Sequence, residues 1–182
     1  VAENHDMKHE DFFYFKGPVF NITTDSTDIT FNIARIFGNI LKAGDIVCLD
    51  GDLGAGKTVF TAGIADSLGI KESVPSPTFT ILIEHRDGKL PLFHFDVYRL
   101  SGEDEFYDLG FSEYFYENGI CVIEWASKIK EAFEKDVIKI LIERDFFNPG
   151  DLRKISFSFP EGDCRLEKLK SEVENYYADT CK

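Results

Sequence analysis

One eight-residue segment constrains the fold of this chain more than any other, because residues 51–58 read GDLGAGKT. The segment matches the pattern G-x-x-x-x-G-K-[S/T], whose backbone N–H groups wrap a triphosphate while its glycines allow close approach. The lysine of this pattern reaches the phosphates, and the final hydroxyl binds Mg²⁺. The segment therefore predicts a loop for a nucleoside triphosphate and Mg²⁺, formed by Gly51, Asp52, Leu53, Gly54, Ala55, Gly56, Lys57 and Thr58.

The sequence on either side of this loop has the secondary structure that such a loop requires. Residues 46–49 form an apolar run without alternation, which is typical of a strand covered on both faces. Residues 57–68 have a helical pattern and are followed by Gly69, a helix-ending residue. The positive end of this helix would point at the phosphates.

Strands and helices are mixed along the rest of the chain. A helix is predicted over apolar positions from Ile29 to Leu41, with Asp25 or Ser26 as its N-cap and Gly44 after its end. The other predicted elements are strands at residues 78–84, 92–98, 120–123, 137–143 and 154–159, turns at 86–89 and 148–150, and helices at 103–118 and from 163 onward.

These elements predict an α/β fold, a P-loop NTPase-like three-layer domain whose sheet is mixed, mainly parallel, with antiparallel additions. Apolar residues make up 43% of the 182 residues, which is enough for a single packed core. We expect residues 1–20 to be a polar and aromatic N-terminal arm and residues 21–182 to form one P-loop ATPase domain.

Hydrolysis needs more than a phosphate loop, because a carboxylate must lie near Mg²⁺ and a further group must position the attacking water. Asp96 and Glu124 stand at the ends of β-rich runs, where the ligand crevice of an α/β sheet opens. Thr78 lies in a Pro-rich segment that could face the γ-phosphate, and Trp125 either packs or lines the site. His94 lies between two phenylalanines and is interpreted as a buried sheet residue rather than a catalyst.

Net charge argues against direct nucleic-acid binding. The formal charge is −13, whereas affinity for nucleic acid depends on Lys and Arg. No apolar run reaches the ~20 residues of a membrane span, and the polar residues 1–10 do not resemble a secretory signal, so we expect a cytoplasmic protein without membrane contact. The spacing of the cysteines favours neither a disulfide framework nor a zinc site, and Cys48 and Cys121 are predicted to be buried.

Four segments occur in an order and at separations that match one known family. They are GDLGAGKT (51–58), SPTFT (76–80), FHFDVYRL (93–100) and IEW (123–125). Together they resemble the TsaE family, the bacterial P-loop ATPase of tRNA threonylcarbamoyladenosine biosynthesis, and the resemblance covers about residues 24–159.

The resemblance implies a role for each matching residue. Lys57 and Thr58 would bind phosphate and magnesium, Glu124 would be the second magnesium ligand, and Asp96 would be the essential acid near the attacking water. The segment around Thr27 would lie near the adenine. The implied cofactors are ATP and Mg²⁺. TsaB- and TsaD-like partners would transfer the threonylcarbamoyl group to adenosine 37 of tRNAs reading ANN codons, so this chain would meet tRNA only indirectly.

The chain departs from the family pattern at two places. Ala126 stands where the family usually has proline, and Thr61-Ala62 occupies a region where it commonly has arginine before the glycine matched by Gly63.

Other functions stay open at this point. The few scattered arginines argue against a small-molecule P-loop kinase, which uses an arginine-rich lid. The sequence also argues against a GTPase, because no Asn is followed by Lys, as the guanine-binding N-K-x-D segment of that class requires. A nucleotide-sensing interaction module, whose ATP turnover is incidental, stays open as an alternative to an ATPase. The sequence does not indicate an oligomeric state.

Overall fold

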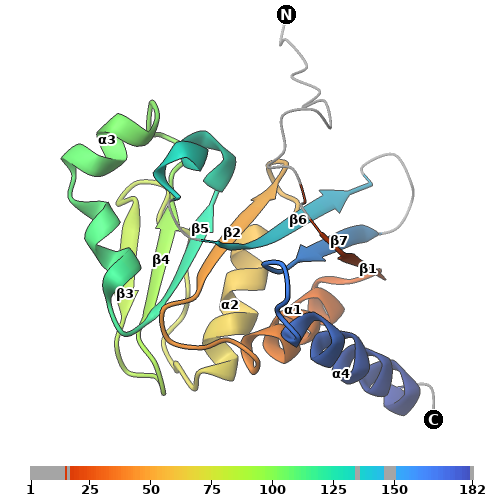
Figure 1. Ribbon diagram of the computed structural model, residues 1–182. Coiled ribbons are helices and arrows are strands. Elements are labelled where there is room, and N and C mark those ends of the chain that lie inside the picture. The colour runs from red at the N-terminus through yellow and green to blue at the C-terminus, as the bar shows by residue number, and fades with distance from the viewer. Residues whose placement is uncertain (1–14, 16, 134–135, 146–150, 181–182) are drawn as a thin grey trace, which may run out of the picture.

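The computed structural model describes residue 15 and residues 17–133, 136–145 and 151–180. Most of the predicted N-terminal arm and the predicted turn at 148–150 lie outside these residues. The described chain forms one seven-stranded sheet with helices on both faces (Figure 1).

The sheet has a parallel centre and antiparallel edges, as predicted. Its strand order is β1-β7-β6-β2-β5-β4-β3, in which β6, β2, β5 and β4 run parallel to one another. Strands β3, β7 and β1 add on in antiparallel pairings. The strand bounds are β1 Val19–Thr24, β2 Ile46–Gly51, β3 Leu82–His85, β4 Leu92–Asp96, β5 Ile120–Glu124, β6 Ile138–Arg144 and β7 Arg153–Ser158.

Helices cover the two faces of this sheet unequally. The larger apolar cluster joins the sheet to α1 (Thr27–Gly38), α2 (Lys57–Ser67) and α4 (Arg165–Thr180). The other cluster lies under α3 (Glu103–Asp108) and two 3₁₀ helices, η1 (Phe111–Tyr116) and η2 (Ala126–Ala132). Successive β2 residues alternate between the clusters, as the side-chain period of a strand requires. The three-layer prediction is therefore confirmed.

Several predicted elements are correct in type but wrong in extent. Helix α1 begins after Ser26, whose Oγ accepts from the Ile29 N–H at 3.2 Å, but it ends at Gly38 rather than near Gly44. A Cβ on Gly38 would lie 2.2 Å from Ser67 Oγ, so α1 and α2 come very close at this point. Ile40 continues into the core from a turn instead of a helix.

The strand predicted after the Pro-rich segment is also shorter than expected. Residues 78–81 form a turn in which the Ile81 N–H donates to Pro77 O at 2.6 Å, and β3 begins only at Leu82. The acidic helix predicted at 103–118 is two helices, separated at Gly110 with its left-handed φ of +74°. Strand β1 was not predicted, and its first residues, Val19 and Phe20, belong to the segment assigned to the arm.

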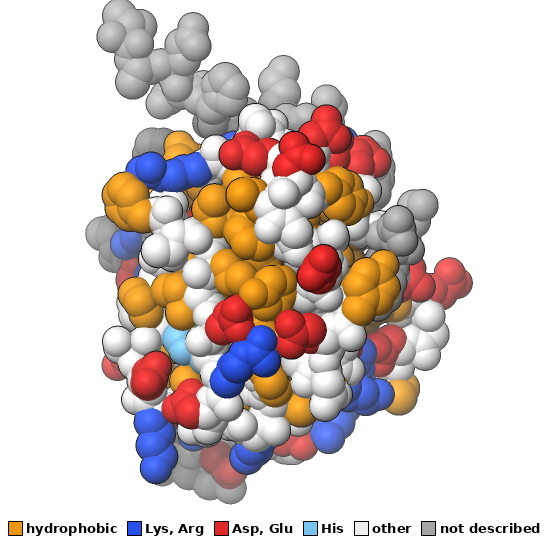
Figure 2. All heavy atoms as spheres, turned by 90° about the vertical axis from the view of Figure 1, so that its left-hand side faces the viewer, with side chains coloured by type: hydrophobic (Ala, Val, Ile, Leu, Met, Phe, Trp, Pro, Cys, Tyr) orange, Lys and Arg blue, Asp and Glu red, His pale blue; other side chains and the backbone are white. Residues whose placement is uncertain are grey.

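The described residues contain no helix that is long and apolar enough to cross a membrane. Cys48 and Cys121 are buried, as predicted. On the face shown in Figure 2, the Lys and Arg side chains of the described residues are dispersed among acidic ones rather than gathered in a band.

Candidate active site

The glycine loop between β2 and α2 has a backbone that side chains would obstruct. Gly51, Gly54 and Gly56 all have left-handed φ values, of +146°, +77° and +112°. At Gly51 a Cβ would lie 2.2 Å from Ile142 O on the neighbouring strand β6, so glycine is required by contact as well as by conformation. The loop is therefore held directly against the sheet.

Helix α2 presents its N-terminus to the loop. Its N-cap is Gly56, which provides no side-chain cap, so the first-turn N–H groups and the helix dipole are directed toward an anion in the loop. Lys57 starts this helix and is 5% exposed. Its Nζ donates to the carbonyls of Gly51 and Asp52 at 2.6 and 2.9 Å and lies 3.7 Å from the centroid of the Trp125 ring.

Burial lowers the pKa of the Lys57 ammonium, and the carboxylates of Glu124, Asp50 and Asp96 oppose this shift. A phosphate would act in the same direction as these carboxylates, because an opposite charge favours the ammonium form. Lys57 is thus suited to bind an anionic ligand.

A hydroxyl and a carboxylate meet beside the first turn of α2. Thr58 Oγ1 donates to Glu124 Oε2 at 3.2 Å. His94 Nε2 lies 2.8 Å from the other oxygen, Glu124 Oε1, and donates to it as the partner of a carboxylate. Glu124 and His94 are 2% and 0% exposed. His94 is a buried sheet residue, as interpreted from sequence, but its contact with Glu124 was not foreseen.

The pair formed by Thr58 and Glu124 fits Mg²⁺. This ion takes oxygen ligands, and proteins usually provide only one or two of them while phosphates and water fill the rest of its shell. Within the described residues, no three or more His, Cys, Asp or Glu side chains are arranged as a metal site. Mg²⁺ would therefore be shared with the phosphates of a bound nucleotide.

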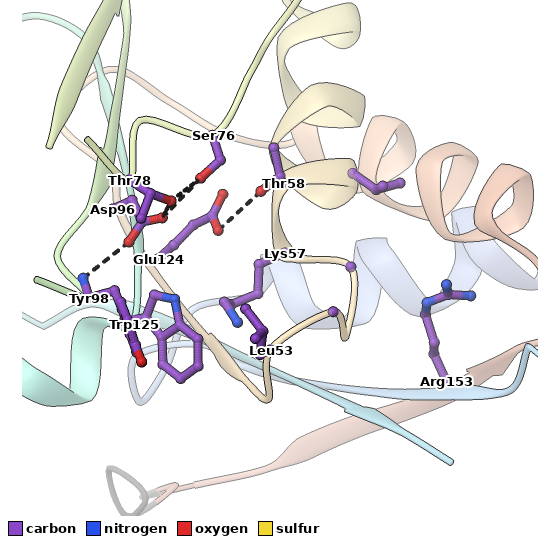
Figure 3. Close-up of a pocket in the computed structure, with 13 residues that line it drawn as sticks. Leu53, Lys57, Thr58, Ser76, Thr78, Asp96, Tyr98, Glu124, Trp125 and Arg153 are labelled. Carbon is purple, nitrogen blue, oxygen red and sulfur yellow. Dashed lines mark hydrogen bonds between the residues drawn. The ribbon is translucent and has the colours of Figure 1, made fainter. Parts of the chain in front are cut away.

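Asp96 ends β4 directly opposite Glu124, the last residue of β5. Its Oδ2 accepts from Ser76 Oγ at 2.9 Å and from Thr78 Oγ1 at 2.5 Å, and its Oδ1 accepts from the Tyr98 N–H at 3.0 Å (Figure 3). These three hydrogen bonds hold the carboxyl group in one orientation. Asp96 is thus a rigid acceptor close to Glu124, as a water-positioning group must be.

These side chains surround one cavity of about 480 Å³. It is lined by most of the predicted site residues, namely Leu53, Gly54, Gly56, Lys57, Thr58, Thr78, Asp96, Glu124 and Trp125. Four predicted residues do not line it. Gly51 is buried as the last residue of β2. The side chain of Asp52 is exposed, and that of Ala55 is buried. Thr27 lies at the start of α1, where its Oγ1 donates to Asp151 Oδ2 at 3.3 Å.

Trp125 is both a packing residue and a site-lining residue. Its backbone is left-handed, with φ of +63°, and its N–H donates to Leu49 O at 3.0 Å. Its ring lies against that of Tyr98, with centroids 5.0 Å apart. Because Lys57 Nζ sits over the same ring, the indole is coupled to the phosphate loop.

Three residues near the loop were missed. Asp50 is buried at the end of β2, where its Oδ1 accepts from Ser127 N and Oγ at 3.1 and 2.9 Å, and burial raises the pKa of this carboxyl. Arg144 and Arg153 bind loop carbonyls. No motif marks any of the three, although an acid directly before a phosphate loop was visible in the sequence.

Both departures from the family pattern are accommodated. Ala126 is the first residue of η2, a position where proline is also tolerated, so the change leaves the backbone intact. Thr61 is buried and its Oγ1 donates to Lys57 O at 3.2 Å. A Cβ on Gly63 would lie 2.4 Å from Phe31 O, so this glycine serves the contact between α1 and α2.

The comparisons with known proteins agree with one another. The family model for "Threonylcarbamoyl adenosine biosynthesis protein TsaE" matches residues 24–151. The tRNA threonylcarbamoyladenosine biosynthesis protein TsaE of Bacillus subtilis is 47% identical over 79% of this chain and 87% of its own length. The protein of the same name from Treponema pallidum is 43% identical over 58% of this chain and 77% of its own.

A solved structure extends the similarity to three dimensions. The crystal structure of Bacillus subtilis YdiB matches with a TM-score of 0.70 and 38% identity, covering 87% of this chain and 96% of that one. The family model matches well over half of the residues, and the glycine loop, Asp96 and Glu124 all lie within the match. This chain therefore belongs to the TsaE family.

Proposed function

We propose that this chain binds and hydrolyses ATP with Mg²⁺ as a component of the machinery that forms threonylcarbamoyladenosine at position 37 of tRNAs reading ANN codons. One observation carries the ATPase part of this proposal. The Thr58–Glu124 pair and the buried Asp96 lie side by side at the mouth of a phosphate loop. The biosynthetic role rests on the names of the relatives.

Each side chain would have a separate task. Lys57 would leave the loop carbonyls to bind the β- and γ-phosphates, and Thr58 with Glu124 would hold Mg²⁺ against them. Asp96 would orient the attacking water and accept its proton. Thr78 bonds to Asp96, so the turn at 78–81 would respond when the γ-phosphate is present.

The arginines of the described residues do not form the lid that a small-molecule kinase needs. Arg86 pairs with Glu84 and Glu117, and Arg165 pairs with Asp45 and Asp163. Arg99 lies with its guanidinium 4.2 Å from the centroid of the exposed Phe79 ring. A positive group supplied by another protein would complete the site.

Partners similar to TsaB and TsaD would supply this group and carry the tRNA. The chain's charge of −13, together with the dispersed basic residues on the face shown in Figure 2, gives it little means of binding RNA phosphate itself. A tRNA-modifying role would place the chain in the cytoplasm. We expect ATP turnover to be slow until the partners dock.

The deciding experiment is to measure ATP hydrolysis with and without the two partner proteins, alongside anisotropy binding of labelled tRNA to the chain alone. Turnover should rise when the partners are added, and tRNA should not bind at physiological salt. Failure to bind Mg²⁺-ATP would contradict the ATPase proposal. Turnover that is unchanged at saturating partner concentrations would contradict only the dependence on partners, and sub-micromolar tRNA binding would contradict the indirect role.

A further inference from the structure

Two arginines lie opposite each other at the antiparallel side of the sheet, behind the phosphate loop. Arg144 ends β6 and Arg153 begins β7, and the two are direct partners in the strand register. Like charges in such a pair destabilise a sheet. Their placement therefore requires compensating partners, and two such places serve both arginines.

The first place is the loop backbone. Arg153 Nε donates to Ala55 O at 3.0 Å, and Arg144 Nη1 donates to Gly54 O at 3.1 Å. The second place is Asp151, whose Oδ1 lies 2.8 Å from Arg144 Nη2 and whose Oδ2 lies 2.9 Å from Arg153 Nη1. Hydrogen bonding from Arg153 lowers the pKa of Asp151, with smaller contributions from the arginine charges and Thr27, so this carboxyl stays ionised as their counter-ion.

From this arrangement we propose that Arg144 and Arg153, bridged by Asp151, form a clamp that positions the phosphate loop for its anion. The proposal rests on the proposed nucleotide site and adds to it two positioning residues outside its motifs. Arg153 also lies beyond residue 151, where the match to the family model ends.

The clamp acts through the geometry of the peptide bond. In a planar trans peptide, the C=O of one residue and the N–H of the next point in opposite directions. Holding Ala55 O toward Arg153 therefore turns the Gly56 N–H away from Arg153. Holding Gly54 O toward Arg144 turns the Ala55 N–H inward, where it donates to Asp52 O at 3.1 Å and closes the loop.

Burial and packing give the two arginines unequal weight. The side chain of Arg153 is 5% exposed, whereas that of Arg144 is 34% exposed. A Cβ on Gly56 would lie 3.2 Å from Arg153 Nε, so this guanidinium packs directly behind the glycine. Figure 3 shows Arg153, which also lines the cavity, on the side of the loop away from Asp96 and Glu124, so it lies apart from the carboxylates proposed for Mg²⁺ and water.

The test compares ligands that share phosphates but differ in the nucleoside. Dissociation constants for Mg²⁺-ATP, Mg²⁺-ADP and Mg²⁺-tripolyphosphate are measured by calorimetry for wild type, Arg153→Lys, Arg144→Ala and Asp151→Asn. The control is Arg86→Ala, which removes an exposed arginine paired with Glu84 and Glu117 away from the cavity. Thermal unfolding confirms that each variant is folded.

Arg153→Lys should weaken the binding of all three ligands by about tenfold or more, because a hydrogen bond from a charged group is lost or misplaced. Arg144→Ala and Asp151→Asn should weaken the same binding by about threefold to tenfold, and Arg86→Ala should leave the three dissociation constants unchanged. Amide hydrogen exchange at residues 54–56 should be faster in the ligand-free clamp variants than in wild type. A role in stability alone would lower the unfolding temperature without this change in tripolyphosphate affinity.

Two results would overturn the clamp. The first is an unchanged affinity for tripolyphosphate in folded Arg153→Lys and Arg144→Ala proteins. The second is a lower affinity for ATP with an unchanged affinity for tripolyphosphate, which would mean that the arginines contact the nucleoside. If wild type itself bound none of the three ligands, the proposed function would fail, and this outcome is distinct from wild-type binding with unaffected variants.

Discussion

The two sides of the phosphate loop are built in different ways. On one side, parallel strands β4 and β5 end in Asp96 and Glu124, which are buried and adjacent in register. On the other side, antiparallel strands β6 and β7 bring Arg144 and Arg153 against the loop carbonyls. The carboxylate side carries groups suited to Mg²⁺ and water, whereas the two arginines hydrogen-bond to loop carbonyls and pair with Asp151, and Arg153 also lines the cavity.

This difference shows how chemistry and geometry are divided around one loop. The groups proposed to touch the reacting atoms, Asp96 and Glu124, lie at the carboxyl ends of β4 and β5, where the crevice of an α/β sheet opens. The groups proposed to shape the loop come from the antiparallel pair β6 and β7 on its other side. Variants on the carboxylate side should therefore change turnover or magnesium dependence, while those on the arginine side should change affinity for phosphates.

Lys57 lies in the loop between the two sides, and its replacement should have the largest effect on ATP turnover. Lys57→Ala removes the positive charge that would stabilise the transferred phosphoryl, so ATP turnover should fall by about 10³-fold or more. The measurement is phosphate release with saturating partners, and Lys170→Ala on the exposed face of α4 is the matched control. Turnover by Lys57→Ala equal to that of wild type would remove the loop from the mechanism.

Asp96 tests whether the carboxylate side separates binding from chemistry. Asp96→Ala should lower turnover by about 10²-fold, as loss of a general base does, while Mg²⁺-ATP affinity stays near the wild-type value. Phosphate release measures turnover, and the fluorescence of Trp125, the only tryptophan, measures the affinity for Mg²⁺-ATP. The control is Asp104→Ala in α3. A normal rate for Asp96→Ala would show that another group positions the water.

His94 acts through Glu124 and should give a smaller effect. The substitution His94→Asn removes the imidazole that bonds to Glu124, so the affinity for Mg²⁺ should fall by about tenfold, as it does when a metal ligand loses its hydrogen-bond partner. Excess Mg²⁺ should then restore turnover. His85→Asn on β3 is the matched control, because His85 is also buried and its ring nitrogens have no hydrogen-bond partner within the described residues. Turnover that Mg²⁺ does not rescue would contradict a role through the metal ligand.

Asp50 lies beneath the loop and belongs to neither side, so its effect should be on stability. Burial raises its pKa, which means that the folded protein binds this proton more tightly than the unfolded chain does. The stability that wild type has relative to Asp50→Asn should therefore fall as pH rises from below the ordinary Asp pKa through the raised value, and then level off. Urea unfolding of both proteins across this range measures the difference, and a difference that grows with pH would contradict the assignment.

Local patterns were sufficient for the parts of the site that consist of contiguous residues. The glycine loop, the strand before it and the helix after it are specified within residues 46–68, because a phosphate loop needs backbone conformations that only certain residues adopt. Asp96 and Glu124 could be predicted as neighbours because parallel strands all end at the same edge of a sheet. The burial of Cys48 and Cys121 could also be predicted from local sequence.

Element ends were less predictable because contacts between elements decide them. Helix α1 stops at Gly38, where it crosses α2 too closely for a side chain. The acidic segment breaks at Gly110, although its composition favours one helix. Strand β1 exists because it pairs with β7, a residue range far along the chain, so nothing local in its sequence marks it.

The sequence by itself therefore determined the kind of loop, its two carboxylates and the family to which the chain belongs. Only the tertiary structure decided that His94 holds Glu124, that Trp125 lies under Lys57, and that Arg144 and Arg153 bind the loop from behind. The physical reason is sequence separation. Strand pairing brings Arg153 to Ala55 across 98 positions, and no periodicity within either segment encodes that contact.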